Sequence, residues 1–246
     1  MMPDLLIGHG YLGQAIVRGG ALSNLVAVRR TVAKADPSQG GLVALAADVL
    51  TEAGVAELAA VGDADYRCVY FMLPPSAFGE QAPDIALAPL LAFLRMRAVQ
   101  RVVLVSSTGV YADSTEEAIT LAVTPRVQSP RVRRLLAIEQ AWIATGLEVV
   151  IVRLVGIYGP GRVIGQRSVI EQQVLAGDGD AWLNLIHVDD AARAIVTAGA
   201  MAKPPSQLLV SDGVPCKRRD YYGTLAEFLA CPEPQFDGQQ PRRGAA

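Results

Sequence analysis

The sequence predicts an α/β fold, a doubly wound parallel sheet with helices on both faces and a small C-terminal lobe. Short continuous apolar runs alternate with helix-like segments through the first 155 residues. The apolar runs are rich in β-branched residues, as is typical of parallel strands covered on both faces. Strands that alternate with amphipathic helices predict parallel neighbours joined by right-handed crossovers.

The expected strands are Leu5–Gly8, Leu25–Arg29, Leu42–Leu45, Cys68–Leu73, Val102–Ser106 and Val149–Leu154. The helices between them are expected at 11–22, 51–60, 84–98 and 131–145. Glycines and a proline interrupt the pattern after residue 155, where a helix near 164–176 and shorter strands follow. The sequence therefore predicts one domain over 1–155 and a mixed C-terminal part over 156–232 that covers a substrate. Within that part, 185–200 returns to the main domain, and 233–246 form a loose tail.

The composition excludes several classes of protein. The 246 residues include 51% hydrophobic ones, and 22 basic against 24 acidic residues leave a net charge of −2. No basic patch for nucleic acid or an anionic membrane is evident. Cys68, Cys216 and Cys231 lie far apart and only two histidines are present, so neither a disulfide framework nor a metal site is expected. We expect a cytoplasmic protein, since neither a signal peptide nor an apolar stretch long enough for a membrane span is seen.

A glycine-rich loop follows the first expected strand. Residues 4–20 read DLLIGHGYLGQAIVRGG, with glycines at 8, 10 and 13. The first glycine permits a tight turn, the second lets the backbone approach a pyrophosphate, and the third lets the helix pack closely on the strand. The pattern predicts a Rossmann-like dinucleotide site at Gly8, His9, Gly10, Tyr11, Leu12 and Gly13. The alternative is a plain strand-turn-helix corner.

Two arginines end the second expected strand and bear on the choice of cofactor. Arg29 and Arg30 lie about 20 residues beyond the first glycine, where an acidic residue selects NAD and an arginine accommodates the 2′-phosphate of NADP. NADP is therefore favoured and NAD remains possible, unless these side chains simply reach solvent. Asp48, after the third strand, is placed to meet the adenine edge, although a solvated loop aspartate fits the same pattern.

Further segments resemble the NAD-dependent epimerase/dehydratase family, the extended short-chain dehydrogenase/reductases. The resemblance is carried by VVLVSSTGVY (102–111), IVRLVGIYGPG (151–161) and LIHVDDAARAI (185–195), together with the glycine loop and FMLPP (71–75). It implies a nicotinamide across the carboxyl ends of the strands, a pocket closed by the C-terminal part and a possible homodimer. It also implies cofactor contacts at Leu73, Pro74, Pro75 and Ser106, and a catalytic serine at Ser107.

The expected helix at 131–145 departs from that family. The family's proton-transfer pair is a tyrosine followed four residues later by a lysine, and the corresponding positions here hold Arg131 and Leu135. No tyrosine or lysine occurs between Pro125 and Leu147. Arginine cannot serve as a general acid near neutral pH because its pKa exceeds about 12. Thr108 and Gly109 also replace the acidic pair of sugar dehydratases, so the chain resembles an atypical branch of the family.

Other groups could supply the proton. Tyr111 and Tyr158 both follow expected strands, and water on Ser107 is a third possibility; each ring could equally well pack beside the cofactor. Three hypotheses remain. The chain is an oxidoreductase or epimerase acting on a small molecule with a displaced acid, a dinucleotide-binding regulator or sensor without turnover, or a scaffold with an empty cleft. Apolar residues of the 131–145 helix could form the homodimer interface or cover their own sheet: Leu135, Leu136, Ile138, Trp142 and Ile143.

Overall fold

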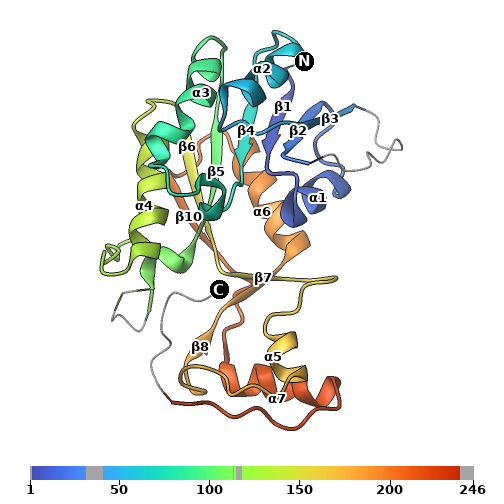
Figure 1. The fold of residues 1–246 in the computed structure, drawn as a ribbon, viewed down its shortest axis with the longest axis vertical. Coiled ribbons are helices and arrows are strands. Elements are labelled where there is room, and N and C mark those ends of the chain that lie inside the picture. Colours follow the sequence, from blue (N-terminus) through green and yellow to red (C-terminus); the bar gives the residue numbers. More distant parts are fainter. Residues whose placement is uncertain (1, 32–40, 113, 115–117, 239–246) are drawn as a thin grey trace.

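The computed structural model describes residues 2–31, 41–112, 114 and 118–238. A large upper part holds the main sheet and its helices, and a smaller lobe lies below it, at the carboxyl ends of the strands (Figure 1). The strands of the main sheet pair in parallel, in the order β10-β6-β5-β4-β1-β2-β3. The predicted α/β fold with a doubly wound parallel sheet is therefore confirmed.

The strand bounds follow the expected ones closely. They are β1 (Asp4–Ile7), β2 (Leu25–Arg29), β3 (Leu42–Ala46), β4 (Cys68–Phe71), β5 (Val102–Ser107), β6 (Val149–Leu154) and β10 (Gln207–Val210). Two differences from the sequence analysis stand out. Besides 185–200, which were expected to return to the main domain, β10 also returns and joins the main sheet, where it pairs with β6. β3 is largely exposed rather than covered on both faces, because it forms the edge of the sheet.

Alternate residues of the strands contribute to two separate cores. One face is covered by α2 (Glu52–Ala60), α3 (Pro83–Arg95) and α4 (Pro130–Ile143), which pack on Ile7, Phe71 and Leu104. The other face is covered by α1 (Tyr11–Arg18) and α6 (Val188–Ala200), which pack on Leu6, Tyr70 and Val103. Helices thus lie on both faces of the sheet, as expected.

Hydroxyl side chains at the N-cap position fix where two of the helices begin. Thr51 caps α2 by accepting a hydrogen bond from the Gly54 N–H at 3.1 Å. Ser129 caps α4 in the same way through the Val132 N–H at 3.3 Å, with a proline as the first helical residue. The short 3-10 helices η1 (Pro75–Phe78) and η2 (Thr108–Tyr111) follow β4 and β5. The prolines of η1 and the hydroxyl-bearing residues of η2 therefore lie at the carboxyl edge of the sheet.

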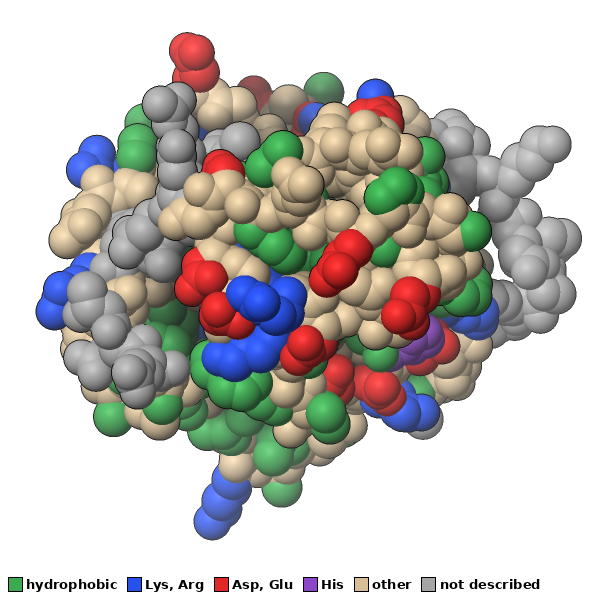
Figure 2. Space-filling model, turned by 90° about the horizontal axis from the view of Figure 1, so that it is seen from below, with side chains coloured by type: hydrophobic (Ala, Val, Ile, Leu, Met, Phe, Trp, Pro, Cys, Tyr) green, Lys and Arg blue, Asp and Glu red, His purple; other side chains and the backbone are tan. Residues whose placement is uncertain are grey.

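The lobe contains two small sheets and two helices. β7 (Gly156–Tyr158) pairs with β9 (Leu185–His187), and β8 (Trp182–Leu183) pairs with β11 (Cys216–Lys217). Its helices are α5 (Gln166–Ile170) and α7 (Arg218–Phe228). The helix expected near 164–176 is thus only about one turn long, because Gln172 adopts a left-handed φ of 52°. Basic and acidic side chains lie side by side on the face seen from this end (Figure 2).

The segment expected as a loose tail is partly ordered. The Leu175 N–H donates to the Gln235 carbonyl at 2.8 Å, and the Asp237 N–H donates to the Leu175 carbonyl at 3.1 Å. The Phe236 ring packs edge-on against Tyr222 at 6.0 Å between centroids. Residues 233–238 therefore pack on the lobe, because an aromatic anchor and a backbone pairing hold them there. Residues 239–246 of the expected tail lie outside the described residues.

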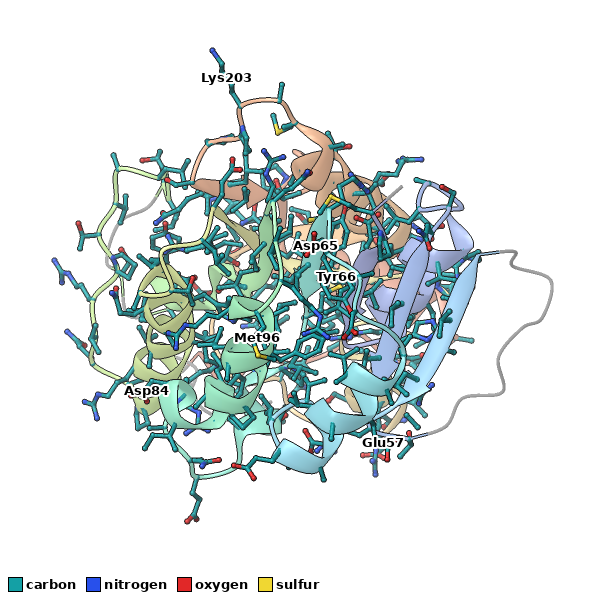
Figure 3. All side chains as sticks on the ribbon, turned by 90° about the horizontal axis from the view of Figure 1, so that it is seen from above. Glu57, Asp65, Tyr66, Asp84, Met96 and Lys203 are labelled. Atoms are coloured by element: carbon teal, nitrogen blue, oxygen red, sulfur yellow. The ribbon has the colours of Figure 1, made fainter. Side chains whose placement is uncertain are left out.

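The opposite end of the molecule, at the amino ends of the strands, carries connecting loops. Figure 3 shows this end, where Asp65 and Tyr66 precede β4 and Met96 follows α3. The Asp65 carboxylate accepts a hydrogen bond from the Ala98 N–H at 2.8 Å and so ties two of these loops together. In the part of the chain that the structure describes, no helix is long and apolar enough to cross a membrane, and no group of His, Cys, Asp and Glu could hold a metal ion. Cys68, Cys216 and Cys231 are free, and burial raises the pKa of the Cys68 thiol to about 12.

Candidate functional site

The glycine loop leaves the carboxyl end of β1, next to the point where the strand order reverses. In such sheets ligands bind in the crevice outside this point. Gly8 has a left-handed φ of 107°, and a Cβ there would lie 3.1 Å from the Met72 backbone just beyond β4. A Cβ at Gly13 would lie 2.7 Å from the Gly8 carbonyl oxygen. Both positions therefore require glycine for the loop and α1 to pack as they do.

Gly10 differs from the other two glycines. A Cβ built at this position meets no atom within 4 Å, so the fold itself has room for a side chain there. Gly10 is also the N-cap of α1, and no side chain caps this helix. The N–H groups of the first turn therefore lack a side-chain cap, and the positive end of the helix dipole lies at Gly10. This combination suits a phosphate group.

Two buried polar atoms in the same loop lack a hydrogen-bond partner among the described residues. They are Nδ1 of His9 and the hydroxyl oxygen of Tyr11. Burial lowers the pKa of His9, and the nearby Arg29 charge lowers it further. Tyr11 lies beside the lobe, because a Cβ at Gly159 would be 2.7 Å from its hydroxyl and the Arg162 guanidinium lies 5.6 Å from its ring centroid. Unpaired buried polar atoms are costly, so these two are natural partners for a bound ligand.

The two arginines expected to select the cofactor stand close to this loop. Arg29 ends β2, is half-buried and donates to the Thr31 hydroxyl at 3.3 Å. Arg30 is exposed. The His9 N–H donates to the carbonyl of Val28, the residue before Arg29, at 3.0 Å, so the end of β2 lies against the glycine loop.

The remaining expected cofactor contacts take positions in turns. Asp48 accepts a hydrogen bond from the Leu50 N–H at 3.1 Å, so one carboxylate oxygen stabilises the turn before α2. Leu73 and Pro74 follow β4, and Pro75 is the first residue of η1. This places them after the strand next to β1.

The two serines at the end of β5 have different partners. Ser106 donates to Oε1 of Glu139 at 2.6 Å. Ser107, the residue expected to be catalytic, accepts a hydrogen bond from the Gly109 N–H at 3.0 Å and caps η2. The Ser107 hydroxyl hydrogen is therefore not committed to Gly109.

A buried polar cluster, consisting of Ser106, Glu139, Arg153 and Tyr111, lies behind η2. Arg153 and Glu139 form a two-pronged ion pair, with Nε–Oε1 at 3.0 Å and Nη2–Oε2 at 2.6 Å. Burial opposes the Arg153 charge, but the hydrogen bond and charge of Glu139 outweigh burial and raise the pKa of Arg153 above its usual range. Nη1 of Arg153 donates to the Tyr111 hydroxyl at 2.5 Å. The cluster thus joins β5, β6, α4 and η2.

This cluster was not foreseen from the sequence. Glu139 was not among the expected site residues, and Arg153 appeared only within the segment IVRLVGIYGPG. One feature of the sequence could have indicated it. Glu139 and Arg153 each stand among apolar residues of an expected helix or strand, where a buried charge needs a partner of opposite charge.

The two positions expected to correspond to the family's Tyr/Lys pair, Arg131 and Leu135, lie on the first turns of α4. Arg131 is exposed, while Leu135 is buried against Tyr111 and Val110. Arg133 is exposed too, and Arg134 donates to the Gly79 carbonyl at 2.6 Å.

The residues of α4 that were considered for a dimer interface mostly face the interior of this chain. Leu135, Ile138 and Trp142 are buried within it.

A cavity of about 620 Å³ opens between the carboxyl ends of the strands and the lobe. Thr108 and Tyr111 of η2 form one wall, Leu209 and Ser211 from β10 and beyond form a second, and Trp182 of β8 forms a third. Its volume lies in the range of small-molecule sites, which is about 300–1,000 Å³. Of the expected catalytic residues, only Tyr111 lines this cavity.

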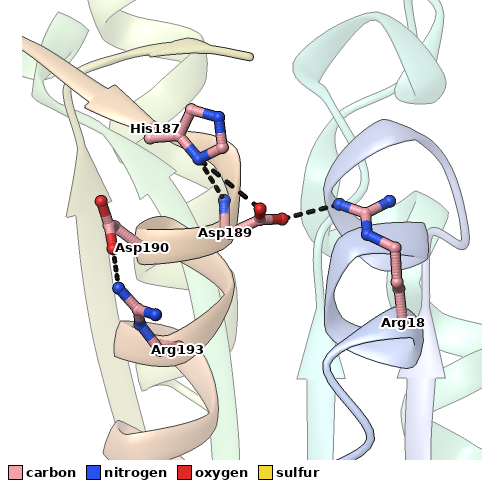
Figure 4. Close-up of polar contacts among 5 residues, drawn as sticks. All are labelled: Arg18, His187, Asp189, Asp190 and Arg193. Atoms are coloured by element: carbon pink, nitrogen blue, oxygen red, sulfur yellow. Dashed lines mark hydrogen bonds and ion pairs between the residues drawn. The ribbon is translucent and has the colours of Figure 1, made fainter. Parts of the chain in front are cut away.

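Tyr158 and the start of α6 lie at the other side, next to the glycine loop. The Tyr158 ring meets His187 edge-on at 5.4 Å. His187, rather than Asp189 or Asp190, caps α6, since its Nδ1 accepts the Asp189 N–H at 3.2 Å (Figure 4). The Asp189 carboxylate instead reaches Arg18 of α1 at 2.6 Å, as Figure 4 also shows. These contacts join the glycine-loop helix to α6.

Comparisons with known proteins agree with this arrangement. The chain is 28% identical over 182 residues to Protein YeeZ of Escherichia coli (strain K12), across 73% of this chain and 65% of that protein. The match thus spans less than two thirds of that relative. A structure from Methylobacillus flagellatus assigned to the NAD-dependent epimerase/dehydratases shares 26% identity and a TM-score of 0.74, over 95% of this chain and 84% of that one. MoeE5, solved in complex with UDP-glucose and NAD, has the same fold at 23% identity and a TM-score of 0.75, over 97% of this chain and 86% of its own.

The model of the NAD dependent epimerase/dehydratase family matches residues 83–210, more than half of the chain. The matched part includes the serines of β5, the buried polar cluster and the first residues of the lobe. The glycine loop lies outside it but takes the dinucleotide-binding geometry described above. The chain therefore belongs to the NAD-dependent epimerase/dehydratase family.

Proposed function

We propose that this protein is an NADP-preferring oxidoreductase or epimerase for a small molecule, with Tyr111 as its proton donor. The proposal is carried by one observation: Tyr111 lines the cavity while its hydroxyl oxygen accepts a hydrogen bond from the buried Arg153. A guanidinium can only donate hydrogen bonds, so the phenol oxygen accepts and its own proton stays available to another acceptor.

The buried polar cluster gives this tyrosine a fixed position. Glu139 holds Arg153 through two hydrogen bonds, and Arg153 in turn holds the Tyr111 oxygen. In the family's usual arrangement a lysine stands beside the catalytic tyrosine. In our proposal a cation from β6 takes that place, because the α4 positions hold Arg131 and Leu135. Tyr158 and water on Ser107 are the alternative donors. Neither residue lines the cavity.

The residues of the glycine loop fit a dinucleotide. Gly10 leaves room for a pyrophosphate against the uncapped first turn of α1, and His9 and Tyr11 supply partnerless polar atoms. Arg29 and Arg30 favour NADP, Asp48 faces the adenine end, and Leu73, Pro74, Pro75 and Ser106 complete the set of contacts. MoeE5 supports a nicotinamide cofactor by binding NAD. When bound, NADP supplies the hydride acceptor or donor. We assign residues 1–155 to its binding and 156–232 to covering the substrate.

The test of the proton donor compares two tyrosines. NADPH oxidation is measured with a panel of small carbonyl compounds, and Tyr111→Phe should lower kcat about hundredfold, within the usual range for loss of a general acid. Tyr158→Phe is the matched control and should change kcat by less than about threefold. NADP affinity, measured by calorimetry, should be the same in both variants. An unchanged kcat in Tyr111→Phe would refute the assignment, and NADP binding without turnover on any substrate would favour a regulator instead.

The cofactor preference has its own test. Changing Arg29→Ala together with Arg30→Ala should weaken NADP binding about tenfold or more, since each charge-assisted hydrogen bond contributes about 1.5–3 kcal/mol. NAD binding should change little, because NAD lacks the 2′-phosphate. Equal losses for the two dinucleotides, measured by calorimetry, would remove the case for selection by these arginines.

A further inference from the structure

The lining of the cavity carries information about the ligand. It is formed mainly by apolar side chains and backbone, including Val155, Ile119 and Leu209. Its polar side chains are hydroxyl and amide groups, among them Thr108, Asn184 and Ser211. None of the described residues that line it is Asp, Glu, Lys or Arg. Such a wall suits an uncharged molecule that makes a few hydrogen bonds.

Three positive charges near the cavity, on Arg153, Lys217 and Arg219, have partners among the described residues. Arg153, behind Tyr111, is buried and paired with Glu139. Lys217 lies over the Trp182 ring at 3.7 Å and donates to the Asp180 carbonyl at 2.8 Å. Arg219 is paired with Asp180 at 2.7 Å. Among the described residues that line the cavity, a diphosphate would find no arginine or lysine of the kind that such groups use as partners in proteins.

An aromatic side chain offers a surface for a ring. Trp182 is 58% exposed, although it lines the cavity and carries Lys217 over its ring. Large exposed aromatic side chains at a cavity mouth are common anchors for apolar ligands. Trp142, the other tryptophan of the chain, belongs to α4 and is fully buried in the core between α4 and the sheet. Fluorescence changes on ligand binding at the cavity would therefore report on Trp182.

We propose that the cavity takes an uncharged ligand with an apolar ring, of the class of aryl ketones and their alcohols, and not a nucleotide sugar. The ring lies against Trp182 and the oxygen faces the hydroxyl group of Tyr111. MoeE5 binds UDP-glucose on the same fold, and this proposal separates the present chain from it by the uncharged side chains among the described residues that line the cavity. The proposal deepens the function proposed above and rests on it only for the role of Tyr111.

The test measures binding, so that it does not depend on turnover. The protein is saturated with NADP, and saturation-transfer NMR is recorded with acetophenone and, separately, with UDP-glucose. Acetophenone should receive saturation on its ring protons, and UDP-glucose should not. Trp182→Ala should weaken acetophenone binding about threefold to tenfold, the range expected for loss of one aromatic partner. Ser211→Phe, which fills the cavity from another wall, should also weaken it. Phe228→Ala removes an aromatic side chain that is 86% exposed on α7 and should have no effect.

Two results would overturn the proposal. One is UDP-glucose binding to the NADP-loaded protein that Ser211→Phe abolishes, which would show that the cavity accepts a diphosphate. The other is acetophenone binding that is absent, or that neither Trp182→Ala nor Ser211→Phe weakens. If acetophenone binds as expected but NADPH does not reduce it, the ligand class stands and the proposed oxidoreductase activity is what fails.

Discussion

The glycine loop and the cavity wall around Tyr111 lie at the same edge of the sheet, but they are built in different ways. The loop depends on backbone: Gly8 and Gly13 are required because atoms of the chain itself fill the space of their side chains. The wall depends on side chains, since Arg153 donates a hydrogen bond to Tyr111 and is itself held by Glu139, which also accepts a hydrogen bond from Ser106. A backbone site can be recognised from glycine spacing, whereas a side-chain site becomes visible only when distant elements meet.

The largest effect should come from the side-chain region. Glu139→Ala leaves Arg153 buried without its carboxylate, and breaking a buried ion pair costs about 3–5 kcal/mol. The free energy of unfolding, measured by urea denaturation, should fall by this amount. Glu148→Ala is the control, because Glu148 is half-exposed and pairs with Arg101 near the surface, where such pairs contribute about 0–1 kcal/mol. Similar losses in both variants would show that the cluster does not stabilise this region as its burial indicates.

A smaller effect on stability is expected in the backbone region, where two glycines can be compared. Gly13→Ala places a Cβ against the Gly8 carbonyl and should lower the free energy of unfolding by about 1–3 kcal/mol. Gly10→Ala meets no atom of the chain, so stability should stay within about 0.5 kcal/mol. NADP affinity, measured by calorimetry, should nevertheless fall about tenfold in Gly10→Ala, because the added methyl group occupies the space proposed for the pyrophosphate. Unchanged affinity would contradict the proposed position of the phosphates.

The smallest effect concerns the pH dependence of stability. Burial and the Arg29 charge lower the pKa of His9 below 6.5 in the folded protein, whereas in the unfolded chain it lies at about 6.5. The neutral side chain therefore contributes stability above about pH 6.5, which is lost as the pH falls through the folded-state pKa. Between about pH 7.5 and pH 5, the melting temperature of His9→Asn should fall less than that of the unchanged protein. Arg29→Gln removes one of the two causes of the lowered His9 pKa, so its melting temperature should fall by an amount between those of His9→Asn and the unchanged protein. Parallel pH profiles of all three proteins would show that His9 is not linked to folding.

Features that depend on neighbouring residues could be predicted from the sequence, and features that depend on contacts between distant segments could not. The apolar runs and helical stripes predicted the succession of strands along the chain up to β6, because hydrophobic periodicity is a local property of the sequence. The return of β10 to the edge of the main sheet was missed, since a four-residue strand has little pattern of its own. The packing of Phe236 on Tyr222 was missed too, because the prolines and glycines of that segment indicated a loose chain.

The sequence by itself determined the α/β fold and the glycine loop. Both depend on residues close together in the chain, where glycine spacing and apolar periodicity restrict the backbone directly. Only the tertiary structure decided that Arg153, Glu139 and Ser106 support Tyr111, and that Trp182 lines the same cavity as Tyr111. Those residues come from separate strands and helices, and nothing local in the sequence states which side chains will meet after the sheet has formed.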